Sequence, residues 1–106
     1  MSDIFPRNAD FMNRVCQQIR KLPDVHKIIL FGSYAKGRAR AESDIDLAVF
    51  FHTDETCLIE KYRQLTRICR NIEVDIQAQP FHASELGQPL GIIEEIVGYG
   101  IELDAS

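Results

Sequence analysis

The apolar residues of this chain recur with two different spacings, which predict where its helices and strands lie. A repeat of three or four positions predicts a first helix over residues 8–21. Its apolar face carries Phe11, Val15, Ile19 and Leu22. The pair Leu22-Pro23 ends this helix, because a proline disfavours helical backbone in the residue before it.

Short apolar runs predict the strands. Residues 27–31 and 45–51 are almost wholly apolar, as in strands that are buried on both faces. Residues 72–79 alternate apolar and polar side chains, so they predict a third strand with one drier face, which Pro80 closes. Residues 101–103 predict a short edge strand.

Helical spacing returns at residues 54–70 and 90–99, and a short helix is expected over residues 33–36, ended by Gly37. Gly100 ends the last helix. The residues expected on the buried faces of the two longer helices are Leu58, Tyr62, Leu65, Cys69, Ile92, Ile93, Ile96 and Val97. This order of elements predicts a single domain, residues 1–106, of the α/β (α+β) class, with helices packed on a small mixed β-sheet.

Composition excludes several classes of protein. No apolar run approaches the roughly 18 residues of a membrane helix, and the N-terminus does not resemble a secretory signal, so we expect a cytoplasmic protein. The net charge of -4 argues against a duplex nucleic-acid partner. Cys16, Cys57 and Cys69 form no Cys-x-x-Cys motif and are expected to be reduced apolar residues.

Gly32-Ser33 stands where an apolar strand is expected to pass into a helix. A glycine there allows phosphate oxygens to approach the backbone, and free amides at a helix start attract anions. The Ser33 hydroxyl can donate to the same anion. When the pair is considered alone, a plain strand-to-helix turn capped by Ser33 is the favoured explanation.

Asp44 and Asp46 lie two positions apart in a largely apolar strand, so their side chains point to the same face. Two neighbouring carboxylates repel each other, and a divalent cation between them removes that cost. Magnesium prefers such oxygen ligands together with phosphates and water. Two solvated acids at a strand end are the alternative.

Asp75 is an acid on the third predicted strand. If that strand lies beside the one with Asp44 and Asp46, three carboxylates converge, which is enough for one or two Mg²⁺ ions, and Asp75 can serve as a general base. Alternatively, Asp75 points to solvent. Glu73 and Gln77 lie two positions before and after it, so all three side chains are on the same face of the predicted strand.

The joint pattern is more specific than its parts. Gly-Ser-Tyr-Ala-Lys-Gly-Arg, then Ser-Asp-Ile-Asp-Leu-Ala-Val, and an acid on a later strand resemble the polymerase-beta-type nucleotidyltransferases, in particular the minimal nucleotidyltransferases (MNT) of prokaryotes. The close match covers residues 29–49, and Asp75 and residues 92–103 extend it. The resemblance implies the polymerase-beta-like nucleotidyltransferase fold.

The resemblance also implies site residues. Gly32 and Ser33 match the phosphate-binding signature, Asp44 and Asp46 the metal-binding carboxylates, and Asp75 the third carboxylate that activates the nucleophile. Among the basic residues of the intervening loop, Lys36 and Arg38 are expected to neutralise the triphosphate, as is Arg40, although a solvated basic loop is an equal alternative.

The implied reaction is Mg²⁺-dependent transfer of an NMP, expected to be AMP from ATP, to a partner protein or small acceptor, with release of pyrophosphate. Minimal family members resemble antitoxins that pair with a separate helical protein of the HEPN class, so the resemblance implies such a partner. The alternative function is a catalytically silent antitoxin that neutralises its partner by contact. A third alternative, a metal-binding structural domain without a nucleotide, leaves Gly32-Ser33 unexplained.

Overall fold

The computed structural model describes residues 10–33, 35–37, 44–52, 58–70 and 76–103, and the elements below lie in these ranges. Four strands form one sheet in the order β3-β2-β1-β4. β1 runs antiparallel to β2 and β4, whereas β2 and β3 are parallel, so the sheet is mixed as expected. The strands are β1 (Val25–Phe31), β2 (Ile45–Phe51), β3 (Ile76–His82) and β4 (Ile101–Glu102).

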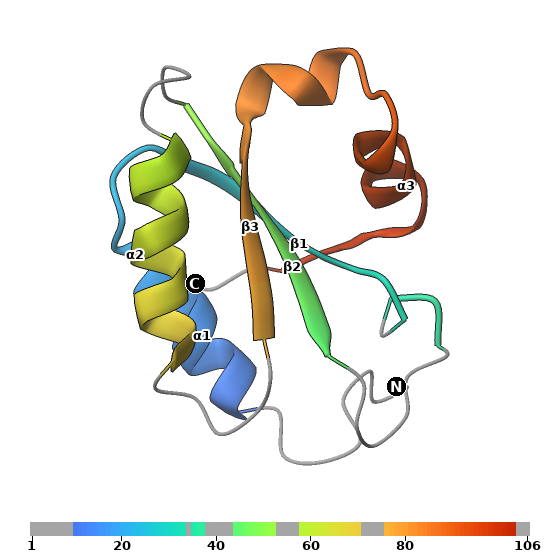
Figure 1. Cartoon of the computed structure of the whole chain (residues 1–106). Helices are drawn as coiled ribbons and strands as arrows, with labels where there is room; N and C mark the ends of the chain where they lie inside the picture. The colour runs from blue at the N-terminus through green and yellow to red at the C-terminus, as the bar shows by residue number, and fades with distance from the viewer. Residues whose placement is uncertain (1–9, 34, 38–43, 53–57, 71–75, 104–106) are drawn as a thin grey trace.

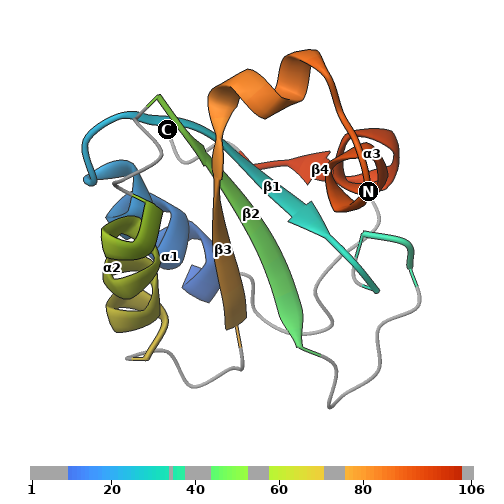
Figure 2. The same cartoon turned by 45° about the horizontal axis from the view of Figure 1, so that its top comes forward.

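The helices cover both faces of the sheet. α1 (Asp10–Arg20) and α2 (Leu58–Arg70) lie on one face, and α3 (Ile92–Tyr99) lies on the other (Figure 1). A tilted view shows β4 entering the sheet beside β1 directly after α3 (Figure 2). A 3-10 helix, η2 (Ala83–Gly87), which the spacing of apolar residues did not predict, links β3 to the segment before α3.

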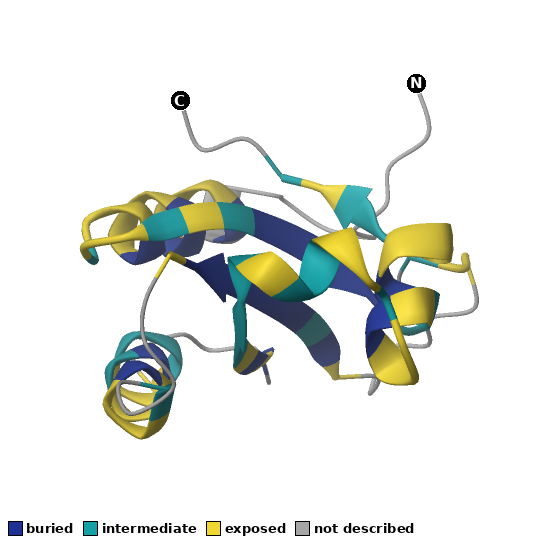
Figure 3. Ribbon diagram, turned by 90° about the horizontal axis from the view of Figure 1, so that it is seen from above, coloured by how far each residue is buried: buried dark blue, intermediate teal, exposed yellow. Residues whose placement is uncertain are grey.

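The alternation of side chains along the strands divides the core into two layers. Ile45, Leu47 and Val49 of β2 pack with α1 and α2, whereas Ala48 and Phe50 face α3. Both central strands are buried along most of their length, and the helices show exposed outer faces (Figure 3). This confirms the prediction of two strands that are buried on both faces.

Three helix-face predictions were wrong. Tyr62 is 51% exposed, and Ile92 and Val97 are each 47% exposed. Lys61 is buried in α2 instead, where its Nζ donates to the Pro23 carbonyl oxygen at 3.1 Å. The long stem of a lysine can cover apolar surface while its ammonium group binds a polar partner. A lysine can therefore occupy a buried position of a helix, although a pattern based on apolar residues alone predicts it to be exposed.

The end of the third strand and the short helix over residues 33–36 also differ from the predictions. Pro80 lies inside β3, not at its end. β3 is an edge strand and has a neighbouring strand on one side only. A proline, which has no N–H to donate, is tolerated there because no strand on the outer side needs that hydrogen bond. The described residues of the predicted helix over 33–36 form turns, because Gly32 and Gly37, with φ of 78° and 71°, flank them with left-handed backbone.

Other predictions are confirmed. α3 ends at Gly100, whose N–H donates to the Ile96 carbonyl oxygen at 2.8 Å, and β4 follows as a short edge strand. Cys16 and Cys69 are free thiols. Within the described ranges, no helix is long and apolar enough to cross a membrane. The predicted start of α2 near Thr53 and Asp54, and Cys57, lie outside the described residues.

Candidate active site

Gly32 and Asp46 lie against each other where β1 ends and β2 begins. Phe31, the last residue of β1, pairs with Asp46 of β2, and Gly32 follows with a left-handed φ of 78°. A Cβ atom on Gly32 would overlap Oδ2 of Asp46 and lie 3.2 Å from its Cγ. Only glycine fits both this backbone conformation and this approach, so the phosphate-signature glycine and the carboxylate share one small site.

Ser33 and Lys36 continue this site in a tight turn. The Lys36 N–H donates to the Gly32 carbonyl oxygen at 3.1 Å, which closes one helix-like turn around the half-buried Ser33. The short helix that was expected to bind phosphate is therefore a single turn in the described residues. Arg38 and Arg40 lie outside the described residues.

The carboxylates of this site differ in exposure. Asp44 is exposed before β2 starts, whereas Asp46 is half-buried within it. Burial raises the pKa of Asp46 above its ordinary value of 3.8, and the negative charges of Asp44 and Glu95 raise it further. A cation held by Asp44 and Asp46 would offset the repulsion between the two carboxylates and favour the ionised form of Asp46. The two residues therefore fit a Mg²⁺ ion chemically.

α3 brings two residues to the site that the sequence motif did not indicate. Nζ of Lys36 forms an ion pair with Oε1 of Glu95 at 2.6 Å and lies 5.3 Å from the centre of the Tyr99 ring. Glu95 also acts on Asp46 through its charge. No signal in the sequence predicts these contacts, because Glu95 and Tyr99 are about sixty residues beyond the turn that they meet.

The parallel strand β3 lies beside the acidic strand β2, which is the arrangement that the convergence of three carboxylates requires. Gln77 is the register partner of Asp46, and paired residues of neighbouring strands point to the same face of a sheet. Gln77 is therefore a further polar neighbour of the site. Asp75, the expected third carboxylate, lies outside the described residues, and within them no cluster of three or more potential metal-ligating side chains occurs.

We expect the metal-free protein to lose stability as pH rises through the ionisation of Asp46. The folded state raises the pKa of this carboxyl above the unfolded value of 3.8. The protonated Asp46 therefore adds to the stability of the fold at a pH below 3.8, and this stability is lost as the pH rises through the pKa of the folded state. At about pH 7 in EDTA, Asp46→Asn should therefore melt higher than the unsubstituted protein, by roughly 2–4 °C for about 0.5 kcal/mol after solvent screening. Thermal denaturation at about pH 7 and about pH 3 measures this difference, which should vanish at the lower pH. A lower melting temperature for Asp46→Asn at neutral pH would contradict it.

A comparison of the sequence with protein-family models decides the family. Residues 13–103 match the model described as polymerase beta, nucleotidyltransferase. The chain belongs to this family. The family is typically metal-dependent, in agreement with the chemistry of Asp44 and Asp46. Among curated proteins, none matches the chain significantly.

Several solved structures share this fold. The chain is similar to a toxin-antitoxin complex with AMP-PNP, with 22% identity and a TM-score of 0.55 over 94% of this chain and 75% of the matched chain. A protein from Sulfolobus solfataricus that is classed as a nucleotidyltransferase matches with 18% identity and a TM-score of 0.62 over 88% and 76%. A complex of a tri-AMPylated Shewanella oneidensis HEPN toxin with its MNT antitoxin matches with 21% identity and a TM-score of 0.51 over 91% and 71%. At these identities, the similarity shows a shared fold.

Proposed function

We propose that this protein transfers an NMP, AMP from ATP, onto a separate helical protein of the HEPN class, and that it acts as the antitoxin of that pair. The observation that carries the proposal is the contact of Gly32 with Asp46, which places a phosphate-accessible backbone beside a carboxylate with a raised pKa. The similar structures include one complex with AMP-PNP and one with an AMPylated toxin, which supports both the nucleotide and the acceptor.

Each residue of the site has a role in this proposal. Asp44 and Asp46 hold Mg²⁺, and Gly32 and Ser33 accommodate the triphosphate. The ion, when bound, neutralises phosphate charge and stabilises the departing pyrophosphate. Asp75 accepts the proton of the acceptor hydroxyl, whose oxygen bonds to the α-phosphorus as the bond to pyrophosphate breaks. Arg38 adds positive charge near the phosphates.

Lys36 is proposed to exchange its partner when the nucleotide binds. In the free protein, Glu95 holds its ammonium group, but both side chains are partly exposed, so the pair contributes about 1 kcal/mol at most. A triphosphate carries more negative charge and can replace Glu95 as the partner. We expect Lys36→Ala to raise the KM for ATP about ten-fold, whereas Glu95→Gln lowers it by up to about five-fold, because no ion pair must then be broken.

Steady-state kinetics with Mg-ATP measure both changes. Lys27→Ala is the matched control. Nζ of Lys27 forms a comparable ion pair with Oε1 of Glu102, at a distance of 3.4 Å, and this pair lies outside the candidate site. The KM of Lys27→Ala should stay unchanged. An increase in KM for Glu95→Gln that equals that of Lys36→Ala would show that the pair positions Lys36 and does not compete with the nucleotide.

Neutralisation by contact is the second candidate function. Four large apolar residues near or within α3 are exposed: Leu90, Ile92, Val97 and Tyr99. Such a surface favours protein-protein contact. If contact alone neutralises the partner, Asp46→Asn will keep full neutralisation in cells, whereas the enzymatic proposal requires its loss.

A radiolabel-transfer assay tests the proposal directly. The purified protein is incubated with α-labelled ATP, Mg²⁺ and the product of the neighbouring gene. Label on the neighbouring protein that disappears with the double variant Asp44→Asn/Asp46→Asn would support nucleotidyl transfer. A stable complex without label would favour the contact-only antitoxin.

A further inference from the structure

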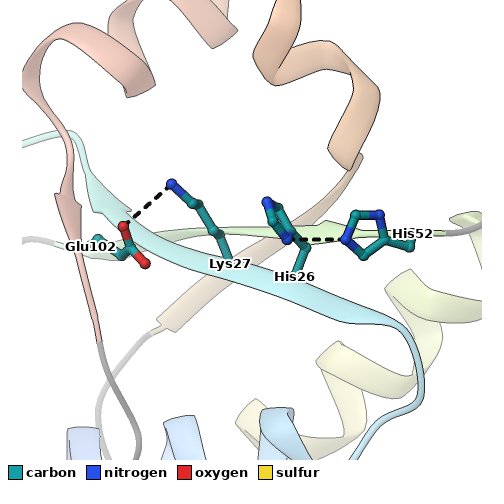
Figure 4. A network of polar contacts seen from close by, with 4 residues as sticks. All are labelled: His26, Lys27, His52 and Glu102. Atoms are coloured by element: carbon teal, nitrogen blue, oxygen red, sulfur yellow. Dashed lines mark hydrogen bonds and ion pairs between the residues drawn. The ribbon is translucent and has the colours of Figure 1, made fainter.

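Two histidines meet at the end of the sheet that lies away from the acidic site. His26 lies near the start of β1, and His52 directly follows β2 (Figure 4). Nδ1 of His26 is 3.0 Å from Nε2 of His52, and the ring centroids are 4.4 Å apart with an interplanar angle of 61°. Both residues are exposed. Because Asp46 pairs with Phe31 at the opposite end of the same ladder, this pair is separate from the candidate active site.

Irregular backbone brings the two rings together. The register of β1 and β2 shifts between Val25 and Lys27, which leaves His26 as the extra residue of a bulge. A bulge re-aims its side chain and is common near functional sites. On the other strand, the His52 N–H donates to the carbonyl oxygen of Asp24 at 2.8 Å, and Asp24 itself has a left-handed φ of 70°. The approach of the rings is therefore set by the backbone on both sides.

The separation of the two nitrogens matches that of two ligands on one metal ion. Imidazole nitrogens bind such ions at about 2.0–2.1 Å, so two of them lie about 2.9 Å apart at the right angles of tetragonal Ni²⁺ or Cu²⁺ and about 3.4 Å apart at the tetrahedral angle of Zn²⁺. In the hydrogen bond, one ring donates and the other accepts. A metal ion requires a lone pair from both, so the donor ring changes tautomer and its proton moves through solvent to its other nitrogen. Exposed rings have room to tilt toward a shared ion.

The basic residue next to the two rings is held in an ion pair. Partial desolvation of the exposed His26 ring and its neighbours His52, Lys27 and Arg20 lower the pKa of His26, whereas Glu102 raises it. Lys27, whose ammonium group would repel a cation, is paired with Oε1 of Glu102 at 3.4 Å (Figure 4).

We propose that Nδ1 of His26 and Nε2 of His52 bind one late first-row transition-metal dication, of the Ni²⁺, Cu²⁺ or Zn²⁺ class, with water in the remaining coordination positions. Imidazole suits these ions, whereas Mg²⁺ prefers oxygen, so this site and the acidic site select different metals. The ion joins the start of β1 to the end of β2. Because it binds only the folded pair, it stabilises the sheet.

Calorimetric titration of the untagged protein with NiCl₂, without nucleotide and with excess MgCl₂, tests the site. We expect one Ni²⁺ per chain, and an affinity at least about ten-fold lower in His26→Asn and in His52→Asn. His82→Asn, which changes the third histidine, is the matched control and should bind as the unsubstituted protein does. At about 100 times the dissociation constant of the unsubstituted protein, Ni²⁺ should raise its melting temperature and that of His82→Asn by roughly 10–20 °C, and those of His26→Asn and His52→Asn by about half as much or less.

A second measurement needs no variant. Zn²⁺ should shift the ¹⁵N resonances of His26 Nδ1 and His52 Nε2 in the intact protein and leave those of His82 in place. Unchanged Ni²⁺ affinity in both single variants, or Zn²⁺ shifts confined to other residues, would overturn the proposal. Neither measurement depends on nucleotidyl transfer, so the result stands whether or not the proposed enzymatic function holds.

Discussion

Asp46→Asn should reduce nucleotide transfer by at least about a thousand-fold while the protein stays folded. Asp46 is the half-buried carboxylate that touches Gly32, so the proposed ion and the phosphates meet at its oxygens. Asparagine keeps the shape of the side chain but removes the charge that holds the ion. A metal ion contributes several kcal/mol to the transition state, and about 4 kcal/mol corresponds to a thousand-fold change in rate.

The transfer assay with α-labelled ATP measures this loss, and circular dichroism checks the fold. Asp24→Asn is the matched control, because Asp24 is an exposed aspartate at the other end of the sheet, and asparagine tolerates its left-handed backbone. Its transfer rate should stay within about two-fold of the unsubstituted rate. If Asp46→Asn retained more than about a tenth of the activity, Asp46 would not hold the ion, because a loss below ten-fold is under about 1.4 kcal/mol.

Gly32→Ala should both destabilise the protein and abolish transfer. The left-handed φ of 78° costs an alanine about 1–2 kcal/mol, and its Cβ would also overlap Oδ2 of Asp46. We expect a total loss of about 3 kcal/mol in the free energy of unfolding, measured by urea denaturation. Gly37→Ala is the matched control: its φ is 71°, but nothing lies within 4 Å of the added Cβ. It should lose only the backbone part, about 1–2 kcal/mol.

A double-mutant cycle isolates the contact between Gly32 and Asp46. Asp46→Ala removes the carboxylate that the new Cβ would meet, so the double variant Gly32→Ala/Asp46→Ala should be more stable than the sum of the single effects predicts, by about 1–2 kcal/mol. Additive effects would mean that the backbone conformation alone requires the glycine. In that case, the close approach would not explain why glycine stands beside the carboxylate.

Local rules of sequence were enough to predict much of the fold and to select the candidate residues of the site, whose roles stay predictions. The apolar run over residues 45–51 predicted a strand buried on both faces, and β2 has those bounds. Glycine predicted the end of α3 correctly. These features depend on residues close together in the chain, so their physical causes are visible in the sequence. The joint motif also predicted the family, which the match over residues 13–103 confirmed.

Contacts between distant segments could not be predicted in this way. The sequence placed Pro80 at the end of a strand, whereas its position at the sheet edge allows it inside β3. Tyr62 was expected inside and lies outside, whereas its neighbour Lys61 is buried and reaches the Pro23 carbonyl oxygen. The role of Asp75 remains a prediction, since it lies outside the described residues.

The sequence by itself determined the paired aspartates, the glycine at the strand end and the family, because strand alternation and glycine turns act within a few residues. Only the tertiary structure decided that Glu95 and Tyr99 of α3 meet Lys36, and that a bulge turns His26 toward His52. The packing of α3 across the sheet and the register of β1 against β2 create these contacts, and both depend on how the whole chain folds.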